Sequence, residues 1–247
     1  MRLPLTSLLL LTAAAVSVPA HAAEIGGGFS VSGNSAVVSD YRFRGLSFSD
    51  EDFAIQGGID LEHESGFYIG TWGSSIEDSP VFGSVELDIY AGWSGEISSG
   101  TTLDIGVLAY LYPDGDVGDA DYFEPYVSLS HQLGPAEATV GFAYAPDQNA
   151  LAGDSGYLWG DLSVGIPTTP ITIDAHVGYV QGSLSTADGN SYVDWSLGAT
   201  YALGPLSLGL AYVDTNVSNA ATLATPGGYA DVIGADATIV FTLGAQF

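Results

Sequence analysis

The sequence predicts an all-β fold, a transmembrane antiparallel up-and-down β-barrel of about 12 strands that follows a cleaved signal peptide. Apolar residues alternate with small, polar or acidic ones from about residue 34 to the last residue, which is the period of a strand. No run after residue 23 reaches the roughly 18 apolar residues of a membrane helix. The connections alternate between short and long, as the turns and loops of outer-membrane barrels do.

The first 22 residues have the pattern of a secretory signal peptide. Arg2 supplies the charged end, residues 8–16 the apolar core, and residues 20–22 the small-residue cleavage site. We therefore expect residues 1–22 to be removed and residues 23–247 to form one barrel domain. The chain has no cysteine, which excludes a disulfide framework and thiol catalysis.

Twelve segments have the alternation expected of strands. They are 34–44, 53–63, 67–74, 85–93, 103–111, 122–132, 136–144, 157–166, 171–179, 193–203, 206–213 and 237–247. Short turns are expected at 64–66, 95–100, 133–135, 167–170 and 203–205, and longer loops at 45–52, 75–84, 113–121, 145–156, 181–191 and 214–230. Short turns at one end and long loops at the other are typical of a membrane barrel.

Alternation alone does not say which face is inside, because a soluble secreted sandwich or barrel would bury the same apolar face. The polar face favours the membrane barrel, since the chain contains no lysine, which a soluble exterior normally carries. Aromatic residues on the apolar face also gather at two levels, as interfacial girdles do. They are Tyr41, Phe43, Phe53, Phe123, Phe142, Tyr144, Tyr179 and Tyr212 at the long-loop end, and Phe67, Trp93, Tyr201 and Phe247 at the short-turn end.

Three stretches carry a family resemblance: "SDYRFRG" (39–45), "ESGFYIGTWGS" (64–74) and "ELDIYAGWSGE" (86–96). In sequence, order and spacing they resemble the TorF-type porin family, proteobacterial conserved hypothetical outer-membrane proteins. The resemblance implies the outer membrane of a Gram-negative bacterium and a channel role, without naming a solute. The last residue, Phe247, is similar to the aromatic ending that such barrels present to the outer-membrane assembly machinery.

The charge balance points to an acidic lumen. The chain has 29 acidic residues and three arginines, of which Arg2 lies in the signal peptide. Nucleic acid is therefore excluded as a partner, and the field inside the barrel is expected to favour cations. The residues we expect to line the lumen or its constriction are Arg42, Arg44, Glu86, Asp88, Glu124, Asp161, Asp194, Asp236, Tyr90, Tyr126 and Trp159.

Arg42 and Arg44 are two positions apart, which in a strand places both on one face. Each is expected to pair with a carboxylate, because an Arg–carboxylate contact at about 4 Å near a protein surface is worth on the order of 4 kcal/mol before desolvation. Asp52 is one expected partner of Arg44. Glu86, Asp88, Glu124 and Asp236 are others. The pair could brace the lumen wall or form a constriction that contacts solutes.

Two further features have competing interpretations. The acidic loop 114–121 could bind calcium, but it lacks the spacing and terminal glutamate of a calcium hand and is better explained as a solvated loop. The inward tyrosine and tryptophan side chains could form a binding platform, but they more often pack and hydrogen bond inside a barrel.

These patterns predict a narrow outer-membrane channel for passive diffusion of small cationic or neutral solutes. The alternative is a structural or adhesive barrel with a closed lumen. Membrane lipids and lipopolysaccharide are the expected surroundings, and no cofactor is expected. No nucleophile motif lies near His63, His131 or His176, so we expect no enzymatic activity.

Overall fold

The computed structural model describes residues 22–185, 190–217 and 233–247. The expected signal peptide lies outside this part, except for its last residue, as does most of the connection 214–230. The strands are β1 (Ala23–Gly26), β2 (Phe29–Val38), β3 (Arg42–Phe43), β4 (Leu46–Ser47), β5 (Ala54–His63), β6 (Phe67–Ser79), β7 (Gly83–Ser98), β8 (Thr101–Leu111), β9 (Tyr122–Leu133), β10 (Ala136–Ala145), β11 (Ser155–Gly165), β12 (Ile171–Gly182), β13 (Ser191–Leu203), β14 (Leu206–Thr215) and β15 (Thr238–Gln246).

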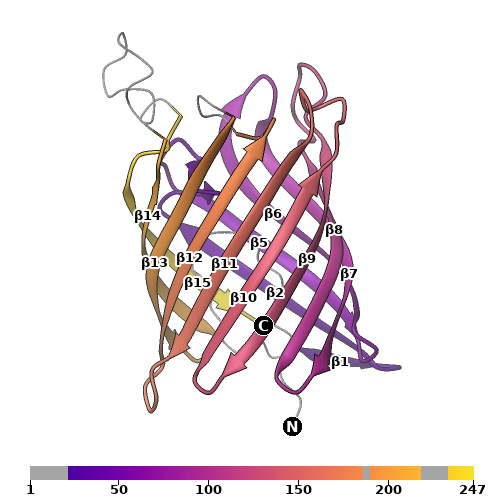
Figure 1. The fold of residues 1–247 in the computed structure, drawn as a ribbon, viewed down its shortest axis with the longest axis vertical. Coiled ribbons are helices and arrows are strands. Elements are labelled where there is room, and N and C mark those ends of the chain that lie inside the picture. The colour runs from indigo at the N-terminus through magenta and orange to yellow at the C-terminus, as the bar shows by residue number, and fades with distance from the viewer. Residues whose placement is uncertain (1–21, 186–189, 218–232) are drawn as a thin grey trace.

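Twelve of these strands, β2 and β5 to β15, close into an antiparallel barrel (Figure 1). From β5 to β15 each strand pairs with the next, and β2 pairs with both β5 and β15, which closes the ring. The predicted fold class is therefore confirmed. Strand β1 pairs with β2 outside the ring, and β3 and β4 form a separate two-residue hairpin.

Two expected boundaries are wrong. The first wall strand is β2, which ends at Val38, so residues 39–44 are not part of the wall. Strands β6 and β7 continue through most of the expected loop 75–84 and leave only residues 80–82 between them. Their register shifts between Ser75 and Ser79. Such an irregularity interrupts the period-2 pattern of the sequence. For this reason the end of the β6–β7 hairpin has the sequence pattern of a loop.

The outer surface of the barrel is apolar, as a lipid-facing surface requires. Along β5, for example, Ile55 and Ile59 point outward and are exposed. The residue after each of them, Gln56 and Asp60, points inward and is buried. Closed pairing leaves no strand edge in the ring, so backbone groups are satisfied without water. No helix among the described residues is long and apolar enough to cross a membrane.

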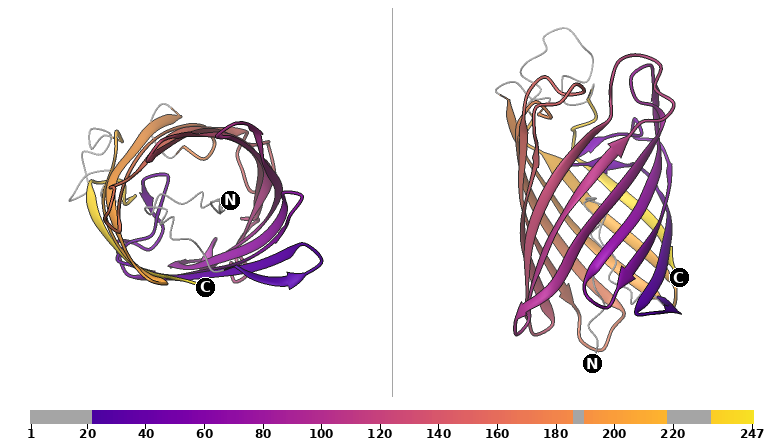
Figure 2. Two further views of the ribbon diagram at one scale, coloured as in Figure 1. Left: turned by 90° about the horizontal axis from the view of Figure 1, so that it is seen from below. Right: turned by 90° about the vertical axis from the view of Figure 1, so that its right-hand side faces the viewer.

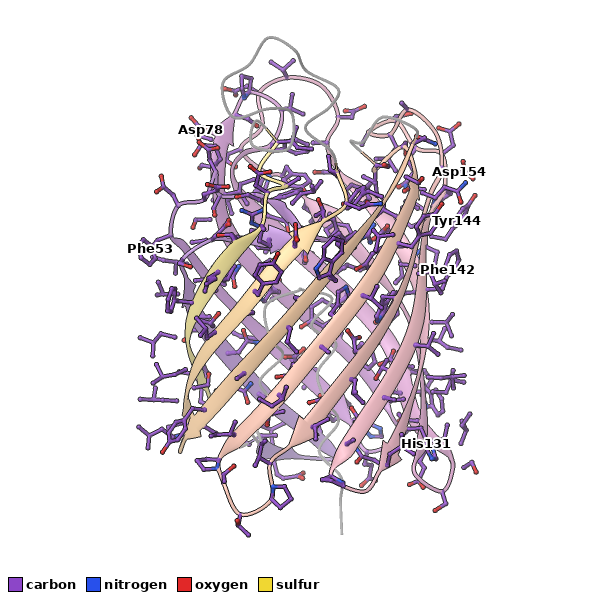
Figure 3. The ribbon with its side chains drawn as sticks, turned by 60° about the vertical axis from the view of Figure 1, so that its left-hand side comes forward. Phe53, Asp78, His131, Phe142, Tyr144 and Asp154 are labelled. Atoms are coloured by element: carbon purple, nitrogen blue, oxygen red, sulfur yellow. The ribbon has the colours of Figure 1, made fainter. Side chains whose placement is uncertain are left out.

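Most of the predicted aromatic rims lie on this outer surface. Figure 3 shows Phe53, Phe142 and Tyr144 projecting from the barrel, and Phe53 is 76% exposed. Tyr41 and Phe43 are corrections, because they are buried at 2% and 7% exposure. The physical reason is that β2 has already ended, so the side chains that follow do not continue its outward alternation.

The inner wall is built from aromatic residues that lie over glycines of the neighbouring strand. In each case a Cβ on the glycine would come closer than 3.0 Å to the aromatic side chain. The cross-strand pairs are Tyr68 with Gly92, Tyr90 with Gly70, Tyr126 with Gly106, and Trp159 with Gly141. These rings therefore pack down on the wall at the places where glycine leaves room, instead of standing across the lumen.

This packing predicts that Gly70→Val is destabilising, because the new side chain must displace the Tyr90 ring and the Asp60 carboxylate. We expect a cost of about 1–3 kcal/mol, as for other overpacked sites, measured by urea unfolding in detergent micelles. Gly160→Val is the matched control, since the nearest atom to a Cβ there is 3.8 Å away. Equal effects of the two substitutions would contradict the packing argument.

Candidate functional site: a loop anchored in the lumen

The connection between β2 and β5, residues 39–53, folds into the barrel, and we call it the lumen loop. Figure 2 (left) shows this segment inside the ring of strands. The chain turns inward at Ser39, forms the β3–β4 hairpin, and reverses at Arg44 and Gly45, whose φ angles of 51° and 82° are in the left-handed region. Glycine tolerates this region and arginine rarely adopts it, so the contacts of Arg44 must hold it there.

Arg44 makes those contacts with three wall strands. Its Nη2 donates to Glu124 Oε2 of β9 at 2.6 Å, and its guanidinium lies 4.3 Å from the ring centroid of Tyr157 of β11. Tyr192 of β13 donates to the Arg44 carbonyl at 3.0 Å. Burial opposes the charged form most strongly, but the Glu124 carboxylate together with Tyr110 and Tyr122 outweighs it and raises the pKa of Arg44 above its ordinary value.

Tyr41 forms the second anchor, on β7. Its hydroxyl donates to Glu86 Oε1 at 2.7 Å, and Tyr112 donates to the other oxygen, Oε2, at 3.0 Å. The Tyr41 ring packs edge-on against Trp72 of β6, with centroids 5.6 Å apart. Burial, followed by the charges of Glu86 and Asp88, raises the pKa of Tyr41 well above its ordinary value, so the hydroxyl stays a donor.

Arg42 closes the lumen loop on itself and on the segment before β15. Its Nε donates to Asp40 at 2.5 Å and its Nη2 to Glu51 at 3.1 Å. Its Nη1 donates to backbone oxygens of Gly45, Gly234 and Asp236. The Arg42 side chain is 1% exposed, so its charge is neutralised inside the protein.

The structure corrects two expectations about the arginines. They do not share a strand face, because the chain turns at Arg44, and their partners lie on different sides: β9 and β11 for Arg44, the segment before β15 for Arg42. The partner of Arg44 is Glu124, one of the expected acids, and not Asp52. Neither guanidinium faces open lumen, since both residues are at most 3% exposed.

A second polar cluster lies on β11 to β13. The ring of His176 contacts Asp161 Oδ1 at 2.6 Å through Nδ1 and Asp194 Oδ1 at 3.1 Å through Nε2. The Tyr157 hydroxyl lies 2.8 Å from Nε2. His176 thus brings Asp161 and Asp194 together. Asp174, two positions before His176 on the same strand, accepts a hydrogen bond from Ser163 instead.

The contacts of the other predicted lumen residues differ from one residue to the next. The Tyr90 hydroxyl donates to Asp60 at 2.5 Å. Tyr126 and Tyr68 share a hydrogen bond between their hydroxyls, and Trp159 stacks on Tyr157 with centroids 5.6 Å apart. Asp236 contributes its backbone oxygen to Arg42. Asp88 is buried on β7, two residues from Glu86.

The acidic loop 114–121 has a carboxylate contact at each end, and at its last residue Asp121 Oδ1 accepts a hydrogen bond from the Tyr112 amide at 2.8 Å. Asp114 Oδ2 accepts hydrogen bonds from the hydroxyl of Ser84 at 2.7 Å and from its amide at 3.0 Å, which lowers the pKa of Asp114. Among the residues that the structure describes, no group of three or more His, Cys, Asp or Glu side chains is arranged to hold a metal ion.

Sequence reasoning missed Tyr41 and Phe43 as parts of the site, because it placed both in the outer aromatic rim. A usable signal was present: Gly45 and the polar residues of "SFSD" (47–50) interrupt the wall pattern directly after the arginines. The alternation of Tyr41, Arg42, Phe43 and Arg44 concealed it, because four residues with period 2 look like a strand end.

The buried Arg44–Glu124 pair predicts a strong effect of removing one partner. Arg44→Met leaves the Glu124 carboxylate uncompensated, and we expect a loss of about 3–5 kcal/mol of unfolding free energy, measured by urea unfolding in micelles. The double variant Arg44→Met/Glu124→Gln should recover most of this loss. An Arg44→Met protein that unfolds at the wild-type urea concentration would show that the pair does not brace the lumen loop.

Comparisons with known proteins agree with the barrel. The structure is similar to the NanC porin (TM-score 0.58, 10% identity, 88% of this chain and 98% of that chain) and to the KdgM porin crystallised with disordered oligogalacturonate (0.57, 8%, 88% and 97%). It is also similar to a Pseudomonas aeruginosa FadL homologue (0.50, 13%, 90% and 76%). At these identities the likeness shows the fold.

A search among curated proteins found no match. A closed barrel with an apolar exterior places the protein in the bacterial outer membrane. A family model described as "Bacterial protein of unknown function (Gcw_chp)" matches residues 22–247. The chain therefore belongs to the Gcw_chp family.

Proposed function

We propose that the protein is a porin-like channel of the TorF type, which passes small cationic or neutral solutes by diffusion and prefers cations. The observation that carries the proposal is the charge of the lumen. Outside residues 1–22 the chain has two basic side chains besides histidine, Arg42 and Arg44. Both are held inside the lumen loop by carboxylates. The field that a solute meets on the remaining wall is therefore dominated by acids.

The lumen loop supports a narrow passage. Its side chains reach β7 through Tyr41, and β9 and β11 through Arg44, while the Arg44 backbone carbonyl accepts a hydrogen bond from Tyr192 of β13. A ring of 12 strands is intermediate between barrels that side chains fill and barrels with a wide water channel. A segment braced across such a lumen leaves room for small solutes only.

The cation preference has a direct test in planar bilayers under a KCl gradient. We expect discrete conductance steps and a reversal potential of the cation-selective sign, because the acidic wall raises the local cation concentration. A reversal potential of the opposite sign would contradict the proposal.

The same experiment separates the channel from the second candidate, a structural barrel with a closed lumen. That candidate is favoured by the burial of Tyr41, Phe43 and Leu46 of the lumen loop, which are each 7% exposed or less. Replacing residues 40–52 by a short Gly-Ser linker should raise conductance several-fold if the loop restricts a working channel. A silent wild-type protein with a conducting variant would support the closed barrel.

We also propose that the protein is not an enzyme. His176 contacts two carboxylates and a tyrosine hydroxyl, which hold it in place without activating a nucleophile. His63 hydrogen bonds with Ser65, two residues away in an exposed turn. We expect no release of fatty acid from detergent-solubilised phospholipid; release that is lost in Ser65→Ala would contradict this.

A further inference from the structure

Asp88 stands out among the acids near the lumen loop because no described residue forms an ion pair or side-chain hydrogen bond with its carboxylate. It is on the lumen side of β7 and is 5% exposed. Its Oδ1 is fully buried and accepts no hydrogen bond from the described residues. By contrast, Glu86, two residues earlier, accepts one tyrosine hydroxyl on each oxygen.

The surrounding charges do not compensate Asp88. Glu86, Asp88 and Glu124 are all buried in the wall near the lumen loop, and Arg44 is the cation that contacts this group. Arg44 contacts Glu124 Oε2 through Nη2, whereas Arg44 Nη1 and Glu124 Oε1 have no partner among the described residues. Buried carboxylates without a counter-charge are costly, and either a proton or a bound cation removes that cost.

The neighbours of Asp88 indicate what kind of cation. In the sheet Asp88 lies between Trp72 of β6 and Tyr110 of β8, its partners in the two ladders. Tyr110 packs on Phe43, with centroids 5.6 Å apart, just as Trp72 packs on Tyr41. A carboxylate flanked by aromatic rings suits a weakly hydrated ammonium group. A divalent metal ion needs several oxygen ligands, and no such metal-holding group occurs in the described part of the chain.

We propose that Asp88 is a binding site for the ammonium group of a small organic cation, on the wall against which the lumen loop packs. The ammonium ion neutralises the Asp88 carboxylate and lies against Trp72 and Tyr110. This inference deepens the proposed function, on which it rests for the route of entry, by naming the solute chemistry.

The test uses the full barrel in detergent micelles and ethylammonium chloride as the probe, with binding followed by saturation-transfer NMR. Wild type should bind ethylammonium and not the uncharged 1-propanol. Asp88→Asn should weaken binding about tenfold, the equivalent of ~1.4 kcal/mol, whereas Asp88→Glu keeps the charge and should bind within a few-fold of wild type. Asp104→Asn is the matched control, because Asp104 is a hydrogen-bonded acid of the neighbouring strand.

Three results would overturn the site: no binding to wild type, unchanged binding to Asp88→Asn, or an equal loss in Asp104→Asn. Heat-modifiable migration of each variant shows that the barrel is folded, and Asp88→Glu decides the matter if Asp88→Asn does not fold. Binding in micelles is independent of conduction. Binding without conductance would contradict the channel and support the Asp88 site. Conductance without binding would support the channel and contradict the site.

Discussion

Backbone hydrogen bonding within the membrane is the constraint on which the rest of this structure depends. No water is available in the hydrocarbon region, so each strand must be paired on both sides. The last pairing, between β15 and β2, covers only the stretch from Val38 paired with Thr242 to Asn34 paired with Gln246. Below it, Phe247 exchanges backbone hydrogen bonds with Gly33, which extends the closure to the last residue.

Closure divides the side chains into two sets with different physical demands. The outward set is apolar because it meets lipid, and the inward set must satisfy its polar atoms within a confined lumen. Glycines of the wall make room for the large inward side chains. Gly70 and Gly141 let the side chains of Tyr90 and Trp159 pack on the wall. The hydroxyl of Tyr90 on β7 then donates a hydrogen bond to Asp60 on β5. Acids of the wall are thereby part of the packing of the inner surface.

The lumen loop extends the same principle to a segment outside the sheet. Its two arginines are buried, and each has a carboxylate within hydrogen-bonding distance. A buried pair of this kind contributes little net stability but penalises any structure that separates it. The Arg44–Glu124 pair therefore specifies where the loop lies more than how stable the barrel is. Beside it, Asp88 Oδ1 has no hydrogen-bond partner among the described residues.

Sequence alone determined the barrel, its strands and the direction of most side chains, because period-2 alternation is local and each strand carries it independently. It also limited the cations available to the lumen to Arg42 and Arg44. Only the tertiary structure decided that β2 ends at Val38, that Tyr41 and Phe43 lie inside the lumen against the wall, and that Arg44 meets Glu124, 80 positions away. These outcomes depend on which wall strands surround a segment after the ring closes, and no local pattern contains that information.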